Sequence, residues 1–298
     1  MNEKVIIDVD TGIDDALAII LAVKTFEKNI LGITTCGGNV GIDLVTENTV
    51  KILALLKTKI KIYQGSNKTL TDRDFINATD YHGTDGLCNL RLKEKIECKQ
   101  SLSACDFITK QARSYPELTI ISLAPPTNIA KAILKNPNLF KKCNIVMMGG
   151  ALDVPGNQTK WAEFNFGQDP ESVDVVLGNV KNTKIVTLDT TNKCLITKEA
   201  NDQLTIRSET GKFLKKSITN WYNFFGIPKS RSFELYDPLA ISCILNDFVK
   251  FENINIEIVK SGQKRGMTRR SNKYPIDISV DVKANDFIEY FIKTINQG

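Results

Sequence analysis

Four aspartates occur within eight residues near the start of this chain, in the order Asp8, Asp10, Asp14 and Asp15. The alternation of a β-strand points Asp8 and Asp10 to the same side. Gly12 permits a sharp turn after them, which brings Asp14 and Asp15 to the first turn of a following helix. The sequence therefore predicts four carboxylates at one strand-to-helix corner.

Such a corner can cap a helix or hold a cation. Carboxylates in the first helical turn are stabilised by the helix dipole by about 0.3–1 kcal/mol each, but capping explains only the last two acids. Crowded carboxylates raise one another's pKa unless a cation keeps them ionised, and no Lys or Arg lies between positions 4 and 24. A donor set of oxygen atoms alone favours a hard ion, calcium or else magnesium. We therefore expect a metal site.

The elements that must position these acids follow from the apolar patterns. β-branched runs predict strands at 5–9, 31–35, 60–63, 118–123, 145–148 and 184–188, and helical periods predict helices at 14–27, 43–56, 102–113, 127–135 and 170–177. This alternation predicts an α/β fold, with a mostly parallel central sheet flanked by helices. Farther on, we expect helices at 211–225 and 238–245, a small C-terminal hairpin from strands near 254–259 and 276–282, and a final helix at 285–295.

Length and composition limit the class of protein. The 298 residues carry 39 Lys and Arg against 34 Asp and Glu, and a net charge of +5 is too small to indicate a nucleic-acid partner. With 42% hydrophobic and 24% charged residues, the chain matches soluble globular proteins. The longest apolar run, 16–23, is shorter than the roughly 20 residues that span a bilayer, so no membrane partner is expected. We interpret residues 1–298 as a single domain.

The cysteines and the first residues bear on the compartment. The seven cysteines are widely spaced and contain no Cys-x-x-Cys pair, which argues against a disulfide framework or a zinc site. Alternating aspartates occupy the place where a signal peptide would have its apolar core. We expect reduced thiols and a cytoplasmic protein.

Three stretches lack an apolar period. Residues 66–90 and 226–235 predict long, mobile surface loops, which in compact domains often cover active sites. Residues 260–273 contain six Lys or Arg and no acid. We interpret this run as a solvated hairpin tip rather than an anion or nucleic-acid patch, because no aromatic residue interleaves with it.

Two families compete for the acidic corner. Asp8-Val9-Asp10-Thr11 resembles the opening of the haloacid dehalogenase-type phosphatases. That family also needs a later Gly-Asp with a spaced Asp to hold magnesium, and no such pattern occurs downstream.

A longer series of motifs resembles the inosine-uridine preferring nucleoside hydrolase family. The opening Asp8-x-Asp10-x-Gly12-x-Asp14-Asp15 is followed, in the family's order, by motifs that span nearly the whole chain. They are Thr34-Thr35 with Gly38-Asn39, His82-Gly83, Thr127-Asn128-Ile129-Ala130, Met148-Gly149-Gly150, Asn157 with Ala162-Glu163-Phe164-Asn165, Asp169-Pro170-Glu171, Asp237-Pro238-Leu239-Ala240 and Arg265-Gly266-Met267-Thr268.

This resemblance implies a nucleoside-hydrolase-like fold and a calcium-dependent enzyme of nucleoside salvage that hydrolyses a ribonucleoside to ribose and free base. It implies a calcium ion that binds the attacking water and the ribose diol, held by Asp10, Asp15, Asp237 and the carbonyl of Leu123. A divalent ion lowers the pKa of its bound water, and Asp10 would accept the proton.

The resemblance also implies a set of sugar contacts around an oxocarbenium-like transition state. The expected residues are Asp14, Asn39 and Asn165 at the 2′ and 3′ hydroxyls, Asn157 and Glu163 at the 5′ hydroxyl, and Met148 and Phe164 as walls of the ribose site. Judged by spacing alone, the Asn and Glu residues could equally bridge backbone groups of a loop.

Two residues bear on the leaving base. His82 is the only histidine of the chain and lies at a family motif position, so we expect it to contact the base or the 5′ side in a catalytic role. Tyr236 stands where many family members have the histidine of His-Asp-Pro-Leu, and we expect a catalytic role for it. A tyrosine hydroxyl, with an ordinary pKa near 10, is a weaker proton donor at neutral pH.

The presence of Tyr236 in place of that histidine leaves several alternatives open. The substrate could be a modified ribonucleoside, such as a 7-deazapurine ribonucleoside, or the chain could be a nucleoside-binding protein with impaired catalysis. Trp221, Tyr222, Phe224 and Phe225 could stack on a base or belong to the core. The sequence chooses neither the base nor calcium over magnesium, and the resemblance implies a homodimer or homotetramer.

Overall fold

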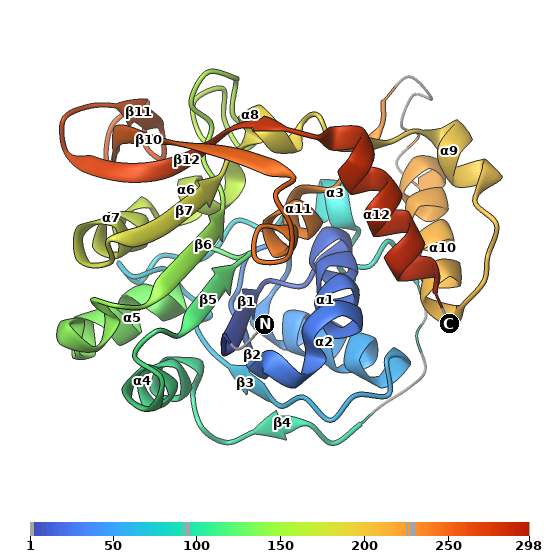
Figure 1. Ribbon diagram of the computed structural model, residues 1–298, viewed down its shortest axis with the longest axis horizontal. Coiled ribbons are helices and arrows are strands. Elements are labelled where there is room, and N and C mark those ends of the chain that lie inside the picture. Colours follow the sequence, from blue (N-terminus) through green and yellow to red (C-terminus); the bar gives the residue numbers. More distant parts are fainter. Residues whose placement is uncertain (1–2, 91, 93–95, 225, 227–230, 298) are drawn as a thin grey trace.

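The structure is a computed structural model that describes residues 3–90, 92, 96–224, 226 and 231–297. One large sheet runs through it (Figure 1). Its strands are β1 (Val5–Val9), β2 (Ile30–Thr35), β3 (Ile62–Gln64), β4 (Lys99–Gln100), β5 (Thr119–Ser122), β6 (Asn144–Met148), β7 (Asn182–Val186), β10 (Val249–Ile258), β11 (Thr268–Arg270) and β12 (Tyr274–Val282). The order across the sheet is β11-β10-β12-β7-β6-β5-β1-β2-β3-β4.

Neighbouring strands run parallel from β12 to β4, and β10 pairs antiparallel with both β12 and β11. The predicted class, a mostly parallel sheet with a C-terminal hairpin, is confirmed. The hairpin begins at Val249, five residues earlier than predicted, and it extends the main sheet.

Helices cover both faces of the sheet (Figure 1). One face packs against α1 (Ile13–Phe26), α2 (Ile42–Leu55), α10 (Glu209–Phe224), α11 (Tyr236–Ser242) and α12 (Ala284–Asn296). The other face packs against α4 (Ala104–Ser114), α5 (Thr127–Lys135) and α7 (Pro170–Asn179). Shorter elements are α3 (Thr79–His82), α6 (Phe164–Gln168), α8 (Leu188–Thr191), α9 (Lys198–Gln203), the 3₁₀ turns Glu27–Asn29 and Pro137–Phe140, and an antiparallel pair of β8 (Leu195–Ile196) with β9 (Phe233–Glu234).

Strand β1 lies at the centre of this arrangement. Val5, Ile7 and Val9 belong to the core on the α1 side, whereas Ile6 belongs to the core on the α4 side. A strand with apolar side chains on both faces is typical of a parallel sheet with helices on both sides. Because both faces are packed, β1 holds the residues that follow it in a fixed place.

The chain reverses its direction of travel across the sheet at β1. It proceeds from β1 to β2, β3 and β4 on one side, and then returns to β5, β6 and β7 on the other side. The carboxyl ends of β1 and β5 therefore diverge into loops on opposite sides, which leaves a crevice where ligands bind in open α/β sheets. The acidic corner predicted from the sequence follows β1 at this point.

The two predicted loops are more ordered than expected. Residues 79–82 form α3, and His82 is buried; both lie inside the stretch interpreted as a mobile loop. Residues 233–234 form β9 and pair with β8. Predicted-loop residues 227–230, including Pro228, lie outside the described residues.

The basic run at 260–273 is neutralised by acids from elsewhere in the chain. Lys260 and Lys273 both contact Asp174, while Lys264 lies over the ring of Trp161. The remaining pairs are Arg265 with Glu171, Arg269 with Glu257, and Arg270 with Asp153. This agrees with the interpretation as a solvated tip, since almost no positive charge remains unmatched for a polyanion.

Two further expectations can be compared with the structure. All seven cysteines are free thiols, and five of them are buried. Among the described helices, none combines the length and the apolar character needed to cross a bilayer.

Candidate active site

The turn from β1 into α1 is built around Asp15. Its carboxylate accepts the backbone N–H of Gly12 at 2.9 Å and that of Asp10 at 3.2 Å. These bonds satisfy donors at the start of α1, so the capping interpretation holds for Asp15. Gly12 has no room for a side chain, because an added Cβ would lie 2.5 Å from the Nδ1 atom of His82 and 2.9 Å from the amide nitrogen of Asn39.

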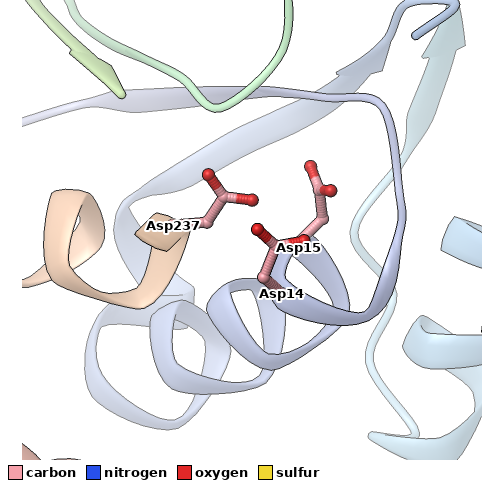
Figure 2. A group of neighbouring side chains, drawn as sticks. All are labelled: Asp14, Asp15 and Asp237. Carbon is pink, nitrogen blue, oxygen red and sulfur yellow. The ribbon is translucent and has the colours of Figure 1, made fainter. Parts of the chain in front are cut away.

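Three carboxylates meet at this corner. Asp14 and Asp15 from α1 and Asp237 from α11 are buried, and one carboxylate oxygen of each lies within 4.8 Å of the others. Figure 2 shows Asp237 facing the first turn of α1. Asp237 is separated from the first two acids by more than 200 residues of chain, and the packing of α11 against α1 brings them together.

This cluster differs from the predicted metal ligands in one member. The prediction placed Asp10 among the ligands and Asp14 on the ribose, whereas the compact group contains Asp14. Asp10 lies beside Asp15, but its carboxylate accepts both the backbone N–H of Asn39 at 2.9 Å and the Asn39 side-chain amide at 3.2 Å. The fourth predicted ligand, Leu123, lines the same cavity, and its carbonyl accepts the Asn165 amide at 2.7 Å.

The electrostatics of the cluster call for a counterion. Burial raises the pKa values of Asp14 and Asp15 to about 6. Burial and the neighbouring carboxylates raise the pKa values of Asp10 and Asp237 well above the ordinary range. The Oδ1 atom of Asp14 is buried and has no hydrogen-bond partner. The buried carboxylates repel one another, and at least one of their oxygen atoms lacks a hydrogen bond. Such oxygen ligands fit a hard divalent cation.

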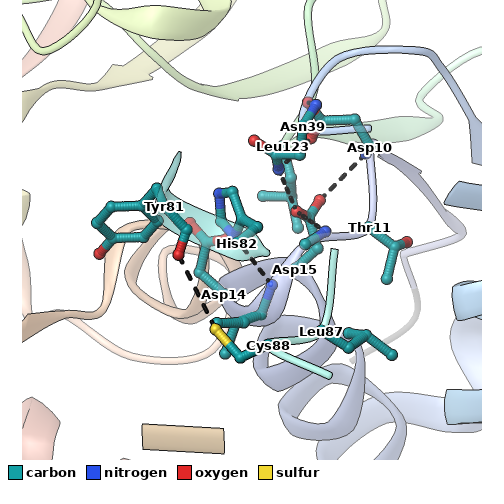
Figure 3. Close-up of polar contacts among 12 residues, drawn as sticks. Asp10, Thr11, Asp14, Asp15, Asn39, Tyr81, His82, Leu87, Cys88 and Leu123 are labelled. Atoms are coloured by element: carbon teal, nitrogen blue, oxygen red, sulfur yellow. Dashed lines mark hydrogen bonds and ion pairs between the residues drawn. The ribbon is translucent and has the colours of Figure 1, made fainter. Parts of the chain in front are cut away.

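His82 packs on the first turn of α1. Its Nδ1 atom accepts the backbone N–H of Ile13 at 3.2 Å and lies 3.9 Å from the Oδ1 atom of Asp14 (Figure 3). Burial lowers the pKa of His82, although Asp14 opposes this effect. A helix N-terminus also disfavours a cation. His82 is therefore a neutral imidazole whose Nε2 atom carries the proton.

A cavity opens beside the cluster at the carboxyl ends of β1 and β5. All eight residues predicted to bind the substrate line it. The described lining residues are Asp14, Asn39, Ala78, Tyr81, His82, Leu123, Met148, Asn157, Glu163, Phe164, Asn165, Arg231, Tyr236 and Asp237. Tyr81 and Arg231 were not anticipated from the sequence, because neither belongs to a motif.

Several of these polar side chains also hold backbone groups. Glu163 caps α6, and its carboxylate accepts the backbone N–H groups of Gly150, Asn165 and Phe166 at 2.9–3.0 Å. The Asn157 side chain accepts the backbone N–H of Phe164 at 2.8 Å. The loop-bridging interpretation is therefore confirmed for Glu163 and Asn157. Bridging also holds their side chains fixed at the cavity wall.

The pKa of buried Glu163 is higher than that of an ordinary glutamate. Burial raises its pKa to about 7, and the three backbone donors oppose that effect. Glu163 is thus poised between its neutral and ionised forms near neutral pH, where it can accept or donate a hydrogen bond.

Tyr236, where the resemblance leads one to expect a histidine, lines the cavity. Burial raises its pKa above the ordinary value, and the neighbouring Glu234, Asp14 and Glu163 act in the same direction. Tyr236 is therefore a neutral hydroxyl throughout the physiological pH range. It can donate a hydrogen bond to a ligand, but it gives up its proton less readily than a histidine.

The aromatic segment of α10 belongs to the core. Trp221 is fully buried and its ring meets those of Tyr81, Tyr222 and Phe233 edge to face. Phe224 is 57% exposed, and Phe225 lies outside the described residues. Of the two interpretations, core packing holds for Trp221 and Tyr222, and Tyr81 is the aromatic residue of this region that reaches the cavity.

Asp8 does not reach the cavity. It is fully buried, and its Oδ1 atom accepts hydrogen bonds from the Thr34 hydroxyl at 2.5 Å and from the Asn128 amide at 2.8 Å. A dehalogenase-type phosphatase would need this carboxylate as an accessible nucleophile. Its absence from the described cavity lining, together with its hydrogen bonds to Thr34 and Asn128, argues against that alternative.

Comparison with known proteins also distinguishes between the two families considered for the acidic corner. The family model described as inosine-uridine preferring nucleoside hydrolase matches residues 5–289. The chain is 32% identical over 310 aligned positions to the pyrimidine-specific ribonucleoside hydrolase RihA of Salmonella newport, with 97% of each chain covered. It is 31% identical to probable uridine nucleosidase 2 of Arabidopsis thaliana, with 90% of this chain and 85% of the relative covered.

Solved structures agree with these sequence relatives. The purine-preferring ribonucleoside hydrolase from Gardnerella vaginalis superposes with a TM-score of 0.90 at 29% identity, covering 99% of this chain and 98% of that one. The plant nucleoside hydrolase PpNRh1 superposes with a TM-score of 0.91 at 26% identity, covering 100% of both chains. The chain therefore belongs to the inosine-uridine preferring nucleoside hydrolase family, and the predicted enzyme class, a hydrolase of N-glycosidic bonds, is confirmed.

Proposed function

We propose that this protein is a calcium-dependent ribonucleoside hydrolase of nucleoside salvage, which converts a ribonucleoside and water to ribose and free base. One observation carries the proposal. One cavity is lined by two of the three clustered carboxylates, Asp14 and Asp237, and by all eight residues expected to bind the nucleoside. The named relatives act on uridine, on pyrimidine nucleosides and on purine nucleosides, so the proposal extends to ribonucleosides of both base classes.

The chemistry of the acidic corner supports the calcium requirement. Asp14, Asp15 and Asp237 offer carboxylate oxygens, with Asp10 next to them and the Leu123 carbonyl at the same cavity. Calcium accepts six to eight oxygen ligands in flexible geometry, whereas magnesium demands a near-ideal octahedron. A cation bound there would lower the pKa of a water ligand and would orient the ribose hydroxyls.

In the proposed mechanism, Asp10 is the general base. Its two hydrogen bonds from Asn39 fix the carboxylate next to the cluster, and it accepts the proton of the attacking water as the oxygen approaches C1′. Positive charge develops on the ribose ring as the bond to the base breaks. The surrounding carboxylates stabilise that charge.

The sugar contacts follow the same cavity. Asp14, Asn39 and Asn165 would bind the 2′ and 3′ hydroxyls, and Asn157 and Glu163 would bind the 5′ hydroxyl. Met148 and Phe164 would form the walls of the ribose site. Because Asn165 is anchored on two carbonyls, those of Leu123 and Met148, its position is set before the substrate arrives, which reduces the ordering cost of binding.

The direct test is turnover of a nucleoside panel. Protein stripped with a chelator and then reloaded with calcium is incubated with uridine, cytidine, inosine, adenosine, a 7-deazapurine ribonucleoside and the matching 2′-deoxyribonucleosides, and reducing sugar is measured. We expect ribose release that needs calcium and the 2′ hydroxyl. The absence of sugar from every nucleoside, in protein shown to bind calcium, would contradict the proposal.

The same panel decides between the remaining alternatives. Turnover confined to the 7-deazapurine ribonucleoside would indicate a hydrolase of modified nucleosides. Calorimetric binding of nucleosides without sugar release would indicate a binding protein with impaired catalysis, which the replacement of the family's histidine by Tyr236 makes a specific alternative.

We also propose a cytoplasmic homodimer or homotetramer. Seven free cysteines support a reducing compartment. Light scattering of the purified protein would test the oligomeric state, and a monomer at micromolar concentration would contradict it.

A further inference from the structure

The cavity wall contains a cation that the mechanism above does not use. Arg231 is the one arginine or lysine among the described residues that line the cavity, which it shares with the acids Asp14, Glu163 and Asp237. Within the described part of the chain, its guanidinium donates no hydrogen bond and forms no ion pair. Its N–H groups are therefore available to a ligand.

Aromatic rings hold this guanidinium in place. Its Cζ atom lies 5.8 Å from the centre of the Tyr81 ring and 5.6 Å from that of Trp221. The Tyr81 hydroxyl donates to Glu234 at 2.9 Å, and its ring meets Trp221 edge to face at 5.5 Å. An arginine that stacks on rings keeps its N–H edge free for another partner. By contrast, every arginine of the 260–273 stretch binds a carboxylate.

The charge of Arg231 acts on the region where the family's histidine is missing. It opposes the burial that raises the pKa values of Glu234 and Tyr236. Tyr236 keeps its proton and can only donate a hydrogen bond. A group that carries permanent positive charge is therefore present beside the residue that replaces the histidine.

Cleavage of a nucleoside separates charge in a defined direction. The electron pair of the C1′–N bond moves to the base, so the ribose becomes positive and the base becomes negative. Carboxylates suit the ribose side of this cavity, but they oppose negative charge on the base. A preorganised cation placed where negative charge develops is among the strongest sources of rate acceleration, at about 10²–10³-fold for one donor.

We propose that Arg231 is a catalytic residue that donates hydrogen bonds to the departing base and stabilises its negative charge, while Tyr81 and Glu234 act as positioning residues for it. This inference rests on the proposed function. In the step, the C1′–N bond breaks with its electrons on the base, the oxygen of water bonds to C1′, and Asp10 takes the proton of that water. The base anion then takes a proton from solvent and Asp10 returns its proton to solvent, so the overall products are ribose and the neutral base.

The test compares leaving groups of different quality in the calcium-loaded full chain. Arg231→Met removes the charge at similar length, and Arg231→Lys keeps the charge without the planar fork. Uridine and inosine have poor leaving groups, whereas 4-nitrophenyl β-ribofuranoside releases a phenolate that is stable without a proton. For Arg231→Met we expect kcat on the nucleosides to fall about 10²-fold or more, with less than a threefold change on the nitrophenyl riboside, and for Arg231→Lys an intermediate loss.

Two further variants sharpen the result. Arg113→Met, on the exposed side of α4, is the matched control and should behave as wild type. Tyr81→Phe removes the bond to Glu234, and it should lower kcat on nucleosides more than on the nitrophenyl riboside.

Each contrary outcome is distinct. An equal loss on both substrates would show that Arg231 supports the structure of the cavity, and no loss on either would show that it has no part in catalysis; both overturn the inference and leave the proposed function intact. If the wild-type protein cleaves no ribonucleoside at all, both proposals fall.

Discussion

The carboxylates of Asp10 and Asp15 both accept the side-chain amide of Asn39, at 3.2 and 3.1 Å, but they differ in their backbone partners. Asp15 accepts two backbone N–H groups at the start of α1, so moving it would disturb the helix. The carboxylate of Asp10 accepts its hydrogen bonds from Asn39 and caps no backbone group of α1. A carboxylate that is held in place but does not cap a helix can serve as a proton acceptor.

We therefore expect Asp10→Asn to lower kcat by about 10²–10⁴-fold, the range for loss of a general base. Asparagine retains an oxygen that can accept from Asn39, so calcium binding measured by calorimetry should weaken less than catalysis. An unchanged kcat would remove Asp10 from the mechanism. Asp43→Asn, an exposed acid in the first turn of α2, is a suitable control.

Because the chain has one histidine, its protonation state can be measured without overlap from other imidazoles. Because Nδ1 of His82 accepts the Ile13 N–H, the imidazole should be the neutral Nε2–H tautomer. Burial lowers its pKa, so it should remain neutral below pH 6.5, its ordinary value. Nitrogen-15 NMR of tag-free protein would show one imidazole with these shifts. A protonated ring at pH 7 would contradict the assignment.

The residues that we propose to bind the ribose could be predicted from motifs, whereas Tyr81 and Arg231 could not. Asn165 and Glu163 lie in a recognisable segment and line the cavity as expected. Tyr81 and Arg231 reach the same cavity from segments without a periodic pattern. Their position depends on how α3 and the strand β9 pack, and single-sequence patterns carry no information about that packing.

At the scale of elements, side chains of neighbouring helices hold the segment between β3 and α3: Asn128 and Asp169 accept the backbone N–H groups of Ser66 and Leu70, and Gln168 makes two further bonds. The segment between β3 and α3 passes Gln168 of α6, whose amide accepts the backbone N–H of Ile76 at 3.0 Å and donates to its carbonyl at 2.7 Å. Two residues later, the backbone N–H of Ala78 donates to the carbonyl of Asn39. Gln168 thus helps to fix the segment that carries Tyr81 and His82.

Gln168→Ala should release this segment. Loss of two hydrogen bonds costs about 1–3 kcal/mol, and we expect KM to rise about 5- to 30-fold, with a smaller fall in kcat because Tyr81, which positions Arg231, lies on the released segment while the carboxylates do not. Limited proteolysis should become faster within residues 66–78. Gln203→Ala, at the exposed end of α9, is the control. A variant with wild-type KM and wild-type cleavage would show that the segment is held by other contacts.

Long elements were predicted well and short ones were missed, for a physical reason. Strand β1 and helix α1 have enough apolar residues to show a period. Helices α3 and α6 have four and five residues, too few for a helical repeat to appear. Their formation depends on tertiary contacts, such as the Glu163 cap on α6, and both happen to carry site residues.

For the whole molecule, the acidic corner makes stability depend on pH and calcium together. Burial raises the pKa values of Asp14 and Asp15 to about 6, and those of Asp8 and Glu163 to about 7. Their ordinary values are 3.8 and 4.5. Between pH 4 and 7 the folded protein therefore binds more protons than the unfolded chain. The free energy of unfolding of the metal-free protein must then fall as the pH rises through this window, since each carboxyl loses its proton in an unfavourable site.

Calcium reverses this penalty because it prefers the ionised carboxylates and displaces their protons. We expect the rise in Tm between chelator and saturating calcium to be small at pH 5 and to grow steadily up to pH 7 or 8. Differential scanning calorimetry at each pH measures it, and the difference cancels the titration of groups far from the site. Asp237→Asn, which removes one carboxylate from the cluster, should reduce both the calcium effect and its pH dependence. A calcium effect of equal size at pH 5 and pH 8 would mean that protons and the cation do not compete at this corner, and it would leave the buried carboxylates without the partner that their clustering requires.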